Sequence, residues 1–419
     1  MECLKGKRLL FLGGGMFDRY ALLEAKKLGI YTVVANFYPA DRSPAKYVAD
    51  ASYDVDNTDT NVMLQLIRDE RIDGIFGGFT DSNLPNYYKL CTLAGFPCYG
   101  SKAQFETTID KAKFKAMCRK YNVPTVQEYK LEEITEDSRV EYPLFIKPID
   151  NSGSRGCSSC YDYKEYCESL QYALSYSPSK TVTIEKYYDF QKYGDFHVCY
   201  SIRDGEVTLA SMADRLLFQV EKNISPLPIH LTYPSQHLDA FIQSMHPKIK
   251  HMLETERFMN GSVFFQGFTD GDHFWLFEMG FRQNGSLHFV LTDHFNRNNT
   301  LIEGIRYALT GEADRSAPER DDPHFSNPAR HFIIHLKPGR VGKIDGVEEA
   351  LRIPGVINFT PLILEGMEVG PQGTLGQSFG RFHIVGKDLG TLDKIEQDVR
   401  DLIRVTDTEG HSMVVSVPF

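Results

Sequence analysis

The sequence contains no apolar stretch long enough to cross a membrane, and no signal-peptide pattern follows Met1. It also contains no run of basic residues. The 46 lysines and arginines are outnumbered by 56 aspartates and glutamates, which gives a formal charge of −10. A nucleic acid or an anionic membrane surface is therefore not expected as the main partner. We predict a cytoplasmic protein that binds neither.

Cysteine is absent from the second half of the chain, because all eight cysteines lie between positions 3 and 199. Only Cys157 and Cys160 have the CxxC spacing of a metal or redox motif, and no second pair accompanies them. A structural zinc site would need that second pair, so free thiols are expected. The sequence also shows no defensible Ser-His-Asp or Cys-His arrangement. This favours chemistry that needs no nucleophilic side chain.

The most informative stretch is 145–156, an apolar strand that ends near Lys147 and continues into a loop of small residues. Ser152, Gly153 and Ser154 would let backbone N–H groups converge on an oxyanion, while Lys147 supplies a point charge. A glycine-rich hairpin tip with a solvated lysine is the alternative. The partner segments elsewhere in the chain favour a phosphate site.

An amphipathic helix is predicted to begin after Asp110, because apolar residues recur at i, i+3, i+4 and i+7 from Phe114. Asp110 is its expected N-cap. Lys111 falls in the first turn, where a cation gains nothing from the helix dipole, so an external anion would explain it. An exposed surface lysine is the alternative.

Two further strands, 261–268 and 273–279, flank a turn and carry Gln266 and Glu278. With a three-residue loop, these two side chains would lie on one face of the hairpin as diagonal neighbours. Oxygen-bearing side chains among phenylalanines are hard to explain as core. They suit Mg²⁺, which takes few protein oxygens and fills its octahedron with water and phosphate.

In this order, these segments together with 182–188 and 277–282 resemble the ATP-grasp superfamily, most closely the L-amino-acid ligases and carbamoyl-phosphate synthetase-like enzymes. The resemblance implies an α/β and α+β fold in three parts. A Rossmann-like pre-ATP-grasp domain would occupy 1–105. The ATP-grasp domain would occupy 106–310, with a hinge near 185–188, and a C-terminal α+β lobe would occupy 325–419.

The resemblance also implies ATP and Mg²⁺ (or Mn²⁺) as cofactors and assigns roles to particular residues. Ile146 and Tyr188 would cover the two faces of adenine, and Arg282 would be the catalytic group that holds transferred phosphoryl oxygens. The remaining assignments are Lys111, Lys147, Ser152, Gly153 and Ser154 to the phosphates, Glu185 and Lys186 to the adenine edge, Asp195 to the ribose, and Gln266 and Glu278 to the metal.

The sequence departs from the family pattern at one metal position. The family places an asparagine two residues after the glutamate, and this chain has Gly280. Asn284 could substitute only if the following turn folds back. One metal site is therefore expected to be weakened or completed by water.

The N-terminal βαβ pattern with Gly13, Gly14 and Gly15 invites a dinucleotide-site interpretation. Asp18 replaces the third glycine of the fingerprint, and Asn36 stands where an acidic ribose ligand is expected. We therefore reject a dinucleotide site. Thr80 and Asp81 are substrate candidates at a strand end, but we favour helix capping by Asp81 or Ser82.

The segment 213–234 contains three prolines and is predicted to be an irregular substrate-side loop, in which Arg215 and His230 are candidate contacts. A single helix is expected from 236 to about 257. In the C-terminal lobe, strands are expected near 331–336 and 382–385, followed by a helix around 392–402.

The function implied by the resemblance is that of an ATP-dependent ligase. It would activate a small carboxylate, with an amino acid as the first choice, as an acyl phosphate and join it to an amine. Its partners would be these two small molecules, and a homodimer is left open. A regulatory ATP-binding protein, or a carboxylase-like or kinase-like use of the fold, are the alternatives.

Overall fold

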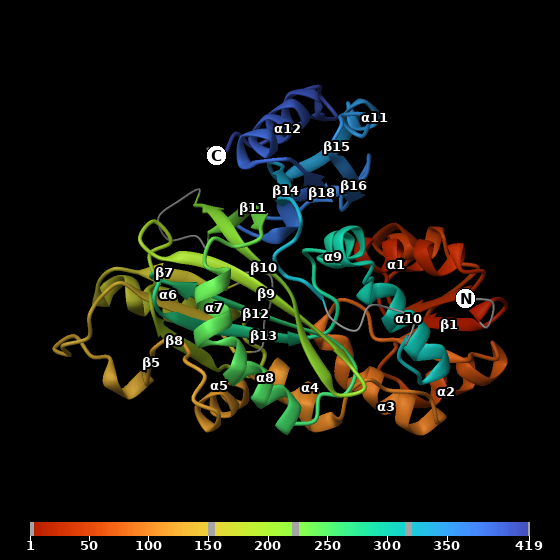
Figure 1. Ribbon diagram of the computed structural model, residues 1–419, viewed down its shortest axis with the longest axis horizontal. Helices are drawn as coiled ribbons and strands as arrows, with labels where there is room; N and C mark the ends of the chain where they lie inside the picture. Colours follow the sequence, from red (N-terminus) through yellow and green to blue (C-terminus); the bar gives the residue numbers. More distant parts are fainter. Residues whose placement is uncertain (1–3, 150–155, 220–225, 315–320, 418–419) are drawn as a thin grey trace.

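The computed structural model describes residues 4–149, 156–219, 226–314 and 321–417 (Figure 1). The N-terminal domain, red to orange in Figure 1, is built on a four-stranded parallel sheet in the order β3-β2-β1-β4. Right-handed βαβ crossovers require helices on its faces. Its elements are β1 Arg8–Phe11, α1 Met16–Lys27, β2 Tyr31–Asn36, β3 Ala51–Asp54, α2 Thr60–Asp69, β4 Gly74–Phe76 and α3 Leu84–Ala94.

Polar side chains fill the space above the glycine turn of this domain. The Asp18 carboxylate accepts a hydrogen bond from the Gly15 N–H at 3.1 Å, and the Asn36 amide donates to Ser43 at 3.0 Å. A Cβ added at Gly14 would collide with both Ser43 and Asn36. The turn is therefore closed by the two side chains that replace the dinucleotide fingerprint residues.

A small antiparallel sheet in the order β5-β8-β6-β7 forms the next unit, at the left of Figure 1. Helix α6 packs on one face of it around a core that contains Ile146 and Tyr166. The elements are α4 Lys102–Ile109, α5 Lys111–Lys120, β5 Glu128–Tyr129, β6 Leu144–Pro148, β7 Ser158–Cys160, α6 Tyr163–Tyr176 and β8 Val182–Lys186.

The largest element is an eight-stranded sheet in the order β13-β12-β9-β10-β11-β14-β18-β16. One of its faces is covered by α7 and α8, where Phe196 and Val198 pack on Phe241 and Met252. The predicted single helix is thus two helices, broken at Met245 just before Pro247. The elements are β9 Gly194–Arg203, β10 Glu206–Phe218, β11 Leu227–Tyr233, α7 Leu238–Ser244, α8 His246–Thr255, β12 Gly261–Thr269, β13 Phe274–Phe281, α9 Phe289–Asn296 and α10 Thr300–Thr310.

The prediction of an irregular segment over 213–234 is wrong for most of its described residues. Strand β10 extends to Phe218, and β11 pairs with both β10 and β14. The sheet accommodates Pro228 because the register shifts next to it, so its missing N–H falls at an irregularity. Strand β11 is what joins the central sheet to the C-terminal strands.

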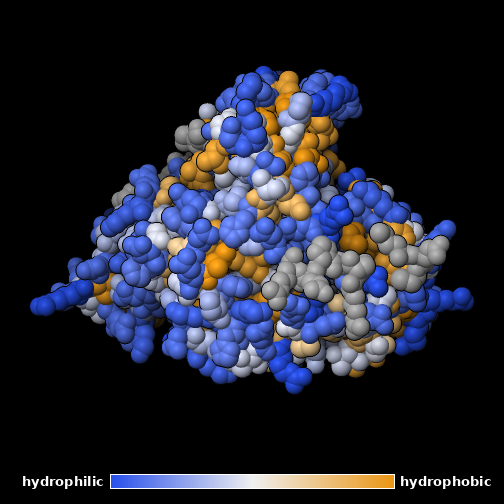
Figure 2. All heavy atoms as spheres, viewed as in Figure 1, coloured by the Kyte–Doolittle hydropathy of each residue, from blue (hydrophilic) through white to orange (hydrophobic). Residues whose placement is uncertain are grey.

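The C-terminal lobe, blue in Figure 1, has a core of its own around Phe382, Leu392 and Val399, yet three of its strands belong to the large sheet. Apolar side chains show on this lobe in the space-filling view, within a largely hydrophilic surface (Figure 2). None of the described helices is both long and apolar enough to span a membrane. The lobe contains β14 Ala329–His335, β15 Gly339–Asp345, α11 Val347–Ala350, β16 Val356–Pro361, β17 Glu368–Val369, β18 Ser378–Val385, α12 Leu389–Leu402 and β19 Arg404–Asp407.

Candidate functional site

A cavity between the small antiparallel sheet and the eight-stranded sheet brings together most of the predicted site residues. We call it the lysine pocket. Phe145, Cys157, Tyr187 and Arg215 also line it. Ser152, Gly153 and Ser154 lie outside the described residues, so their assignment stays a prediction. The predicted residues that line the pocket are Lys111, Lys147, Glu185, Lys186, Tyr188, Asp195, Gln266 and Glu278.

Gln266 and Glu278 lie directly opposite each other in the β12–β13 pair, not diagonally as expected. The connecting turn has four residues, 270–273, and a bulge after Gln266 compensates for the extra one. The two side chains therefore share a face, for a different reason from the one expected. They present one amide oxygen and one carboxylate toward the pocket.

Two lysines face this pair from the other wall of the pocket. The Lys111 ammonium donates to the Ile149 carbonyl at 3.3 Å and forms no ion pair with a carboxylate among the described residues. Burial and the nearby charge of Lys147 lower the pKa of Lys111. The N-cap is formed as predicted, since Asp110 accepts from the Ala112 and Lys113 N–H groups at 2.8 and 3.1 Å. Among the described residues Lys111 thus has no carboxylate partner, and its ammonium is available to an anionic ligand.

Glu185 lies at the pocket wall, but two lysines hold its carboxylate. Lys147 approaches it at 2.8 Å and Lys115 at 2.6 Å, and Lys115 also contacts Glu128 at 2.7 Å. Burial would raise the pKa of Glu185, but the two lysines lower it overall. Glu185 thus positions Lys147, and its assignment to the adenine edge stays a prediction.

Sequence reasoning missed Lys115, which is completely buried. The signal was its helical position, since Lys115 lies one turn after Lys111 and three residues before the buried Cys118. A lysine on the apolar face of a helix indicates a buried carboxylate partner.

The expected cover for a planar base is only partly present. Ile146 points into the core of the small sheet, away from the pocket, because side chains alternate along β6 and Lys147 points inward. Assigning Ile146 to the pocket was therefore wrong, and Phe145 lines it instead. Tyr188 stacks on Phe268 with ring centroids 5.1 Å apart and an interplanar angle of 2°. This aromatic pair forms a flat apolar wall.

Asp195 and Arg215 form a buried pair at one edge of the lysine pocket, with Oδ1 2.7 Å from Nε and Oδ2 3.0 Å from Nη2. Burial raises the pKa of Asp195 to about 6, although Arg215 opposes the shift. Both predicted residues thus reach the pocket. His230 does not, because it lies on the other face of the sheet, where it contacts Glu396 at 3.0 Å.

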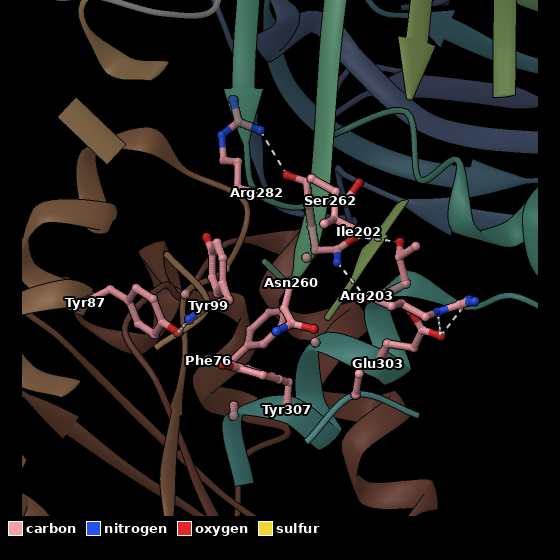
Figure 3. Close-up of a pocket in the computed structure, with 18 of the residues that line it drawn as sticks. Phe76, Tyr87, Tyr99, Ile202, Arg203, Asn260, Ser262, Arg282, Glu303 and Tyr307 are labelled. Carbon is pink, nitrogen blue, oxygen red and sulfur yellow. Dashed lines mark hydrogen bonds and ion pairs between the residues drawn. The ribbon is translucent and has the colours of Figure 1, made fainter. Parts of the chain in front are cut away.

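Arg282 is placed apart from the lysine pocket, at the edge of a second cavity (Figure 3). Its Nη2 contacts Asp81 at 2.6 Å, and its guanidinium lies over the Phe264 ring at 5.1 Å. Burial opposes its charge, yet Asp81 and Glu278 raise the pKa of Arg282. The expected capping by Asp81 or Ser82 was wrong, because neither side chain caps a helix, and Asp81 pairs with Arg282 instead. The catalytic role of Arg282 stays a prediction.

The second cavity lies between the N-terminal domain, the ends of β9 and β12, and α10. Figure 3 shows Tyr87 and Tyr99 on one side of it and the Arg203–Glu303 pair on the other. This pair is 2.8 Å apart, and burial raises the pKa of Glu303 to about 7. Tyr99 donates to the Phe281 carbonyl at 3.0 Å, so the cavity wall also supports the strand end that carries Arg282.

Gly280 is explained by its neighbour across the hairpin. A Cβ at this position would lie 2.2 and 2.3 Å from two Phe264 ring carbons. The aromatic ring therefore occupies the volume that an asparagine side chain would need. Asn284 does not replace it, since its amide contacts Cys199 at 3.2 Å and the ring of His288 at 2.9 Å. Only Gln266 and Glu278 remain as predicted metal ligands.

Replacing Gly280 with asparagine should therefore destabilise the protein, by about 1–3 kcal/mol, because the core around Phe264 becomes overpacked. Adding Phe264→Ala should relieve the clash. In a double-mutant cycle of thermal or urea unfolding, the double variant is expected to lose less stability than the sum of the single variants. Strictly additive losses would mean that the two side chains do not compete for this space.

The described residues contain no group of three or more His, Cys, Asp or Glu side chains that could hold a metal ion. The Gln266–Glu278 pair fits a Mg²⁺ ion that takes its other ligands from phosphate and water, because it offers two hard oxygens. Cys157 and Cys160 are free thiols, and Cys160 donates to the Leu144 carbonyl. They provide no alternative metal site.

The positive charge of Lys111 predicts how the Lys111→Met substitution changes nucleotide binding. The variant should weaken binding of a non-hydrolysable ATP analogue by about tenfold or more, since a charge-assisted contact contributes about 1.5–3 kcal/mol. Its melting temperature should barely change, because no carboxylate loses a partner. Calorimetry measures the affinity. Lys113→Met is the matched control, because Lys113 lies two residues along the helix and pairs with Glu106 at the surface. Unchanged affinity in Lys111→Met would contradict the phosphate assignment.

Comparison with known proteins shows similarity over part of the chain for a family model and over most of it for one relative. Residues 110–251 match the family model described as carbamoyl-phosphate synthase L chain, ATP binding domain. A formate-dependent phosphoribosylglycinamide formyltransferase from Sulfurisphaera tokodaii is 28% identical over 84% of this chain and 86% of its own length. Other sequence relatives are matched over less than half of their own length.

Solved structures resemble nearly the whole chain. The L-amino acid ligase of Bacillus licheniformis superposes with a TM-score of 0.76 at 15% identity, over 96% of this chain and 99% of that one. The biotin carboxylase domain of a Hydrogenobacter thermophilus 2-oxoglutarate carboxylase, solved with MgADP and bicarbonate, gives 0.75 at 16% identity, over 98% and 91%. The predicted fold class is confirmed: the chain shares the ATP-grasp fold with these structures over nearly its whole length, and residues 110–251 are similar to the ATP-binding domain named above.

Proposed function

We propose that the protein is an ATP-dependent ligase that activates a small carboxylic acid and joins it to an amine. The observation that carries the proposal is the opposition of Lys111 and Lys147 to the Gln266–Glu278 pair across one cavity. Two ammonium groups that line one cavity suit a polyphosphate, and two oxygen ligands suit the Mg²⁺ that accompanies it.

The proposed reaction has two steps. A carboxylate oxygen of the acid attacks the terminal phosphorus of ATP, and ADP leaves. The amine then attacks the acyl carbon, and inorganic phosphate leaves. Bound Mg²⁺ would offset charge on the transferred phosphoryl group. The chain contributes positioning and charge: Lys111 and Lys147 hold phosphate oxygens, and Glu185 fixes Lys147.

Arg282 is assigned to the oxygens of the activated acid. Its guanidinium is held between Asp81 and the Phe264 ring, so its free donors have a fixed orientation. A planar fork with a permanent charge suits a charge-dispersed phosphoryl or carboxylate group. Because Gly280 supplies no further ligand, this arginine would have a larger share in offsetting the charge.

Two kinds of acid are candidate substrates, amino acids and formate. An amino acid was the first expectation, and the match to an L-amino acid ligase over nearly the whole chain agrees with it at the level of fold. The sequence relative with the long match is named as formate-dependent. Formate therefore belongs in any substrate panel beside the amino acids.

Hydroxylamine tests the proposal, because it replaces the amine and traps an activated acid as a hydroxamate. With the correct acid, we expect hydroxamate, ADP and phosphate in equal amounts. The panel should contain formate, acetate, hydroxy acids and the amino acids. A kinase would release ADP without phosphate. Tight ATP binding with no hydroxamate from any acid would favour the regulatory alternative.

A further inference from the structure

Arg381 in β18 is a buried guanidinium, 5% exposed, without a counter-charge. Its Nε donates to the Gly285 carbonyl at 3.3 Å and its Nη1 to the Ser378 hydroxyl at 3.5 Å. No carboxylate among the described residues pairs with it. Burial accordingly lowers the pKa of Arg381 to about 10. Buried charges are normally paired, so this one indicates a missing anion.

Arg330, in the adjacent strand β14, is a buried arginine of the same sheet whose charge is paired within the protein. Arg330 is 4% exposed and contacts Asp393 at 2.8 Å and Glu396 at 2.9 Å. Its charge is balanced from within the protein. The two arginines are buried to nearly the same extent, and Arg381 differs in having no acidic partner in the part of the chain that the structure describes.

A histidine beside Arg381 also has unused hydrogen-bonding capacity. His331 is 2% exposed, and neither of its ring nitrogens has a hydrogen-bond partner within the described parts of the chain. Its ring stacks on His383 at 4.9 Å. Burial, with His383, Arg381 and His197 close by, lowers the pKa of His331 well below its usual value. The neutral ring therefore keeps one N–H donor available beside the guanidinium.

The strand register places these side chains on the face that carries Gln266. His331 lies opposite Leu231 and His383, and Arg381 lies opposite Ile333, two residues further along β14. Leu231 in turn pairs with Arg215, and Arg215 pairs with Asp195. Asp195 pairs with Phe268 of β12, two residues from Gln266 and therefore on the same face. Directly paired residues point to the same side of a sheet. The unpaired donors thus lie on the functional face, toward the C-terminal lobe.

We propose that Arg381 and His331 bind the anionic group, a carboxylate or a phosphate ester, of the amine substrate. This inference rests on the proposed ligase function. In the proposed reaction the acid brings its own carboxylate to the phosphates near Lys111 and Lys147, and Arg282, at the edge of the second cavity, is assigned to the oxygens of the activated acid. A second anion site beyond Arg282 is then left for the other substrate. The segment after Arg282 links Arg282 to the proposed anion site, because the Gly285 carbonyl in this segment accepts a hydrogen bond from Arg381.

The first test compares apo stabilities. Arg381→Gln should melt at or above the wild-type temperature, because it removes a buried charge that has no partner. Arg330→Gln, the matched control, should melt at a clearly lower temperature, because it leaves Glu396 with one fewer cation. A loss of apo stability in Arg381→Gln as large as that in Arg330→Gln would assign Arg381 a structural role and overturn the proposal.

The second test titrates inorganic phosphate and acetate separately against wild type, Arg381→Gln and Arg381→Lys in a thermal-shift assay. All three proteins keep Lys111 and Lys147, so their differences report on Arg381. We expect the glutamine variant to bind at least one anion about tenfold or more weakly, and lysine to restore part of the affinity. A selective loss for phosphate indicates a phosphate ester, and one for acetate a carboxylate. If both anions raise the melting temperature of wild type and Arg381→Gln equally, the anion site is excluded. Failure of the hydroxylamine assay, in contrast, would reject the ligase proposal alone.

Discussion

Glu278→Gln is expected to reduce turnover by about a thousandfold or more while leaving the fold intact. The substitution keeps the shape of the side chain and removes the one carboxylate of the Gln266–Glu278 pair. With Gly280 in place of an asparagine, no other side chain in β13 offers an oxygen ligand to a metal ion. The loss should therefore be larger than in a site with a third ligand.

Two measurements check this expectation. Hydroxamate formation reports turnover, and the electron paramagnetic resonance of Mn²⁺ titrated with an ATP analogue reports metal binding. Both should collapse in Glu278→Gln, while Gln266→Ala should have the milder effect. Glu368→Gln, at an exposed strand position, is the matched control for the same chemical change. Normal Mn²⁺ binding by Glu278→Gln would remove Glu278 from the metal site.

Local patterns were sufficient to predict the strands and helices that line the lysine pocket. The helix after Asp110, the strand that ends near Lys147 and the hairpin of Gln266 and Glu278 were each expected from periodicity and turn residues. The structure then brings eight of the predicted residues to one pocket. Such segments are predictable because their signals lie within a few residues of one another.

Long-range features were missed for a physical reason. The pairing of Asp81 with Arg282 joins residues 201 positions apart, and nothing near Asp81 distinguishes a partner from a helix cap. Gly280 could be noted as a departure, but its cause, the ring of Phe264, depends on the register of two strands. Strand β11 was obscured by three prolines, of which only Pro228 lies within the strand, next to a register shift. Each case depends on tertiary context that a single sequence does not specify.

Lys115 is the missed residue with the largest predicted effect on stability. It bridges Glu128 and Glu185, and the latter carboxylate also holds Lys147 at the pocket. Removing one partner of a buried ion pair leaves an uncompensated charge, which costs about 3–5 kcal/mol. We therefore expect Lys115→Met to lower the free energy of unfolding by about this amount in urea denaturation. Lys113→Met, on the same helix and paired with the exposed Glu106, should change it little.

The pH dependence distinguishes a lost charge pair from lost packing. The pKa of Glu185 is lowered in the folded protein from its ordinary value of 4.5. A carboxylate with a depressed pKa stabilises the fold above its unfolded pKa, and this contribution disappears as the pH falls through its folded pKa. The gap between wild type and Lys115→Met should thus be widest near neutral pH and narrow below about pH 4, as the pH falls through the lowered pKa of Glu185. A gap that stays constant from pH 8 to pH 4 would show that Lys115 contributes through packing and not through its charge.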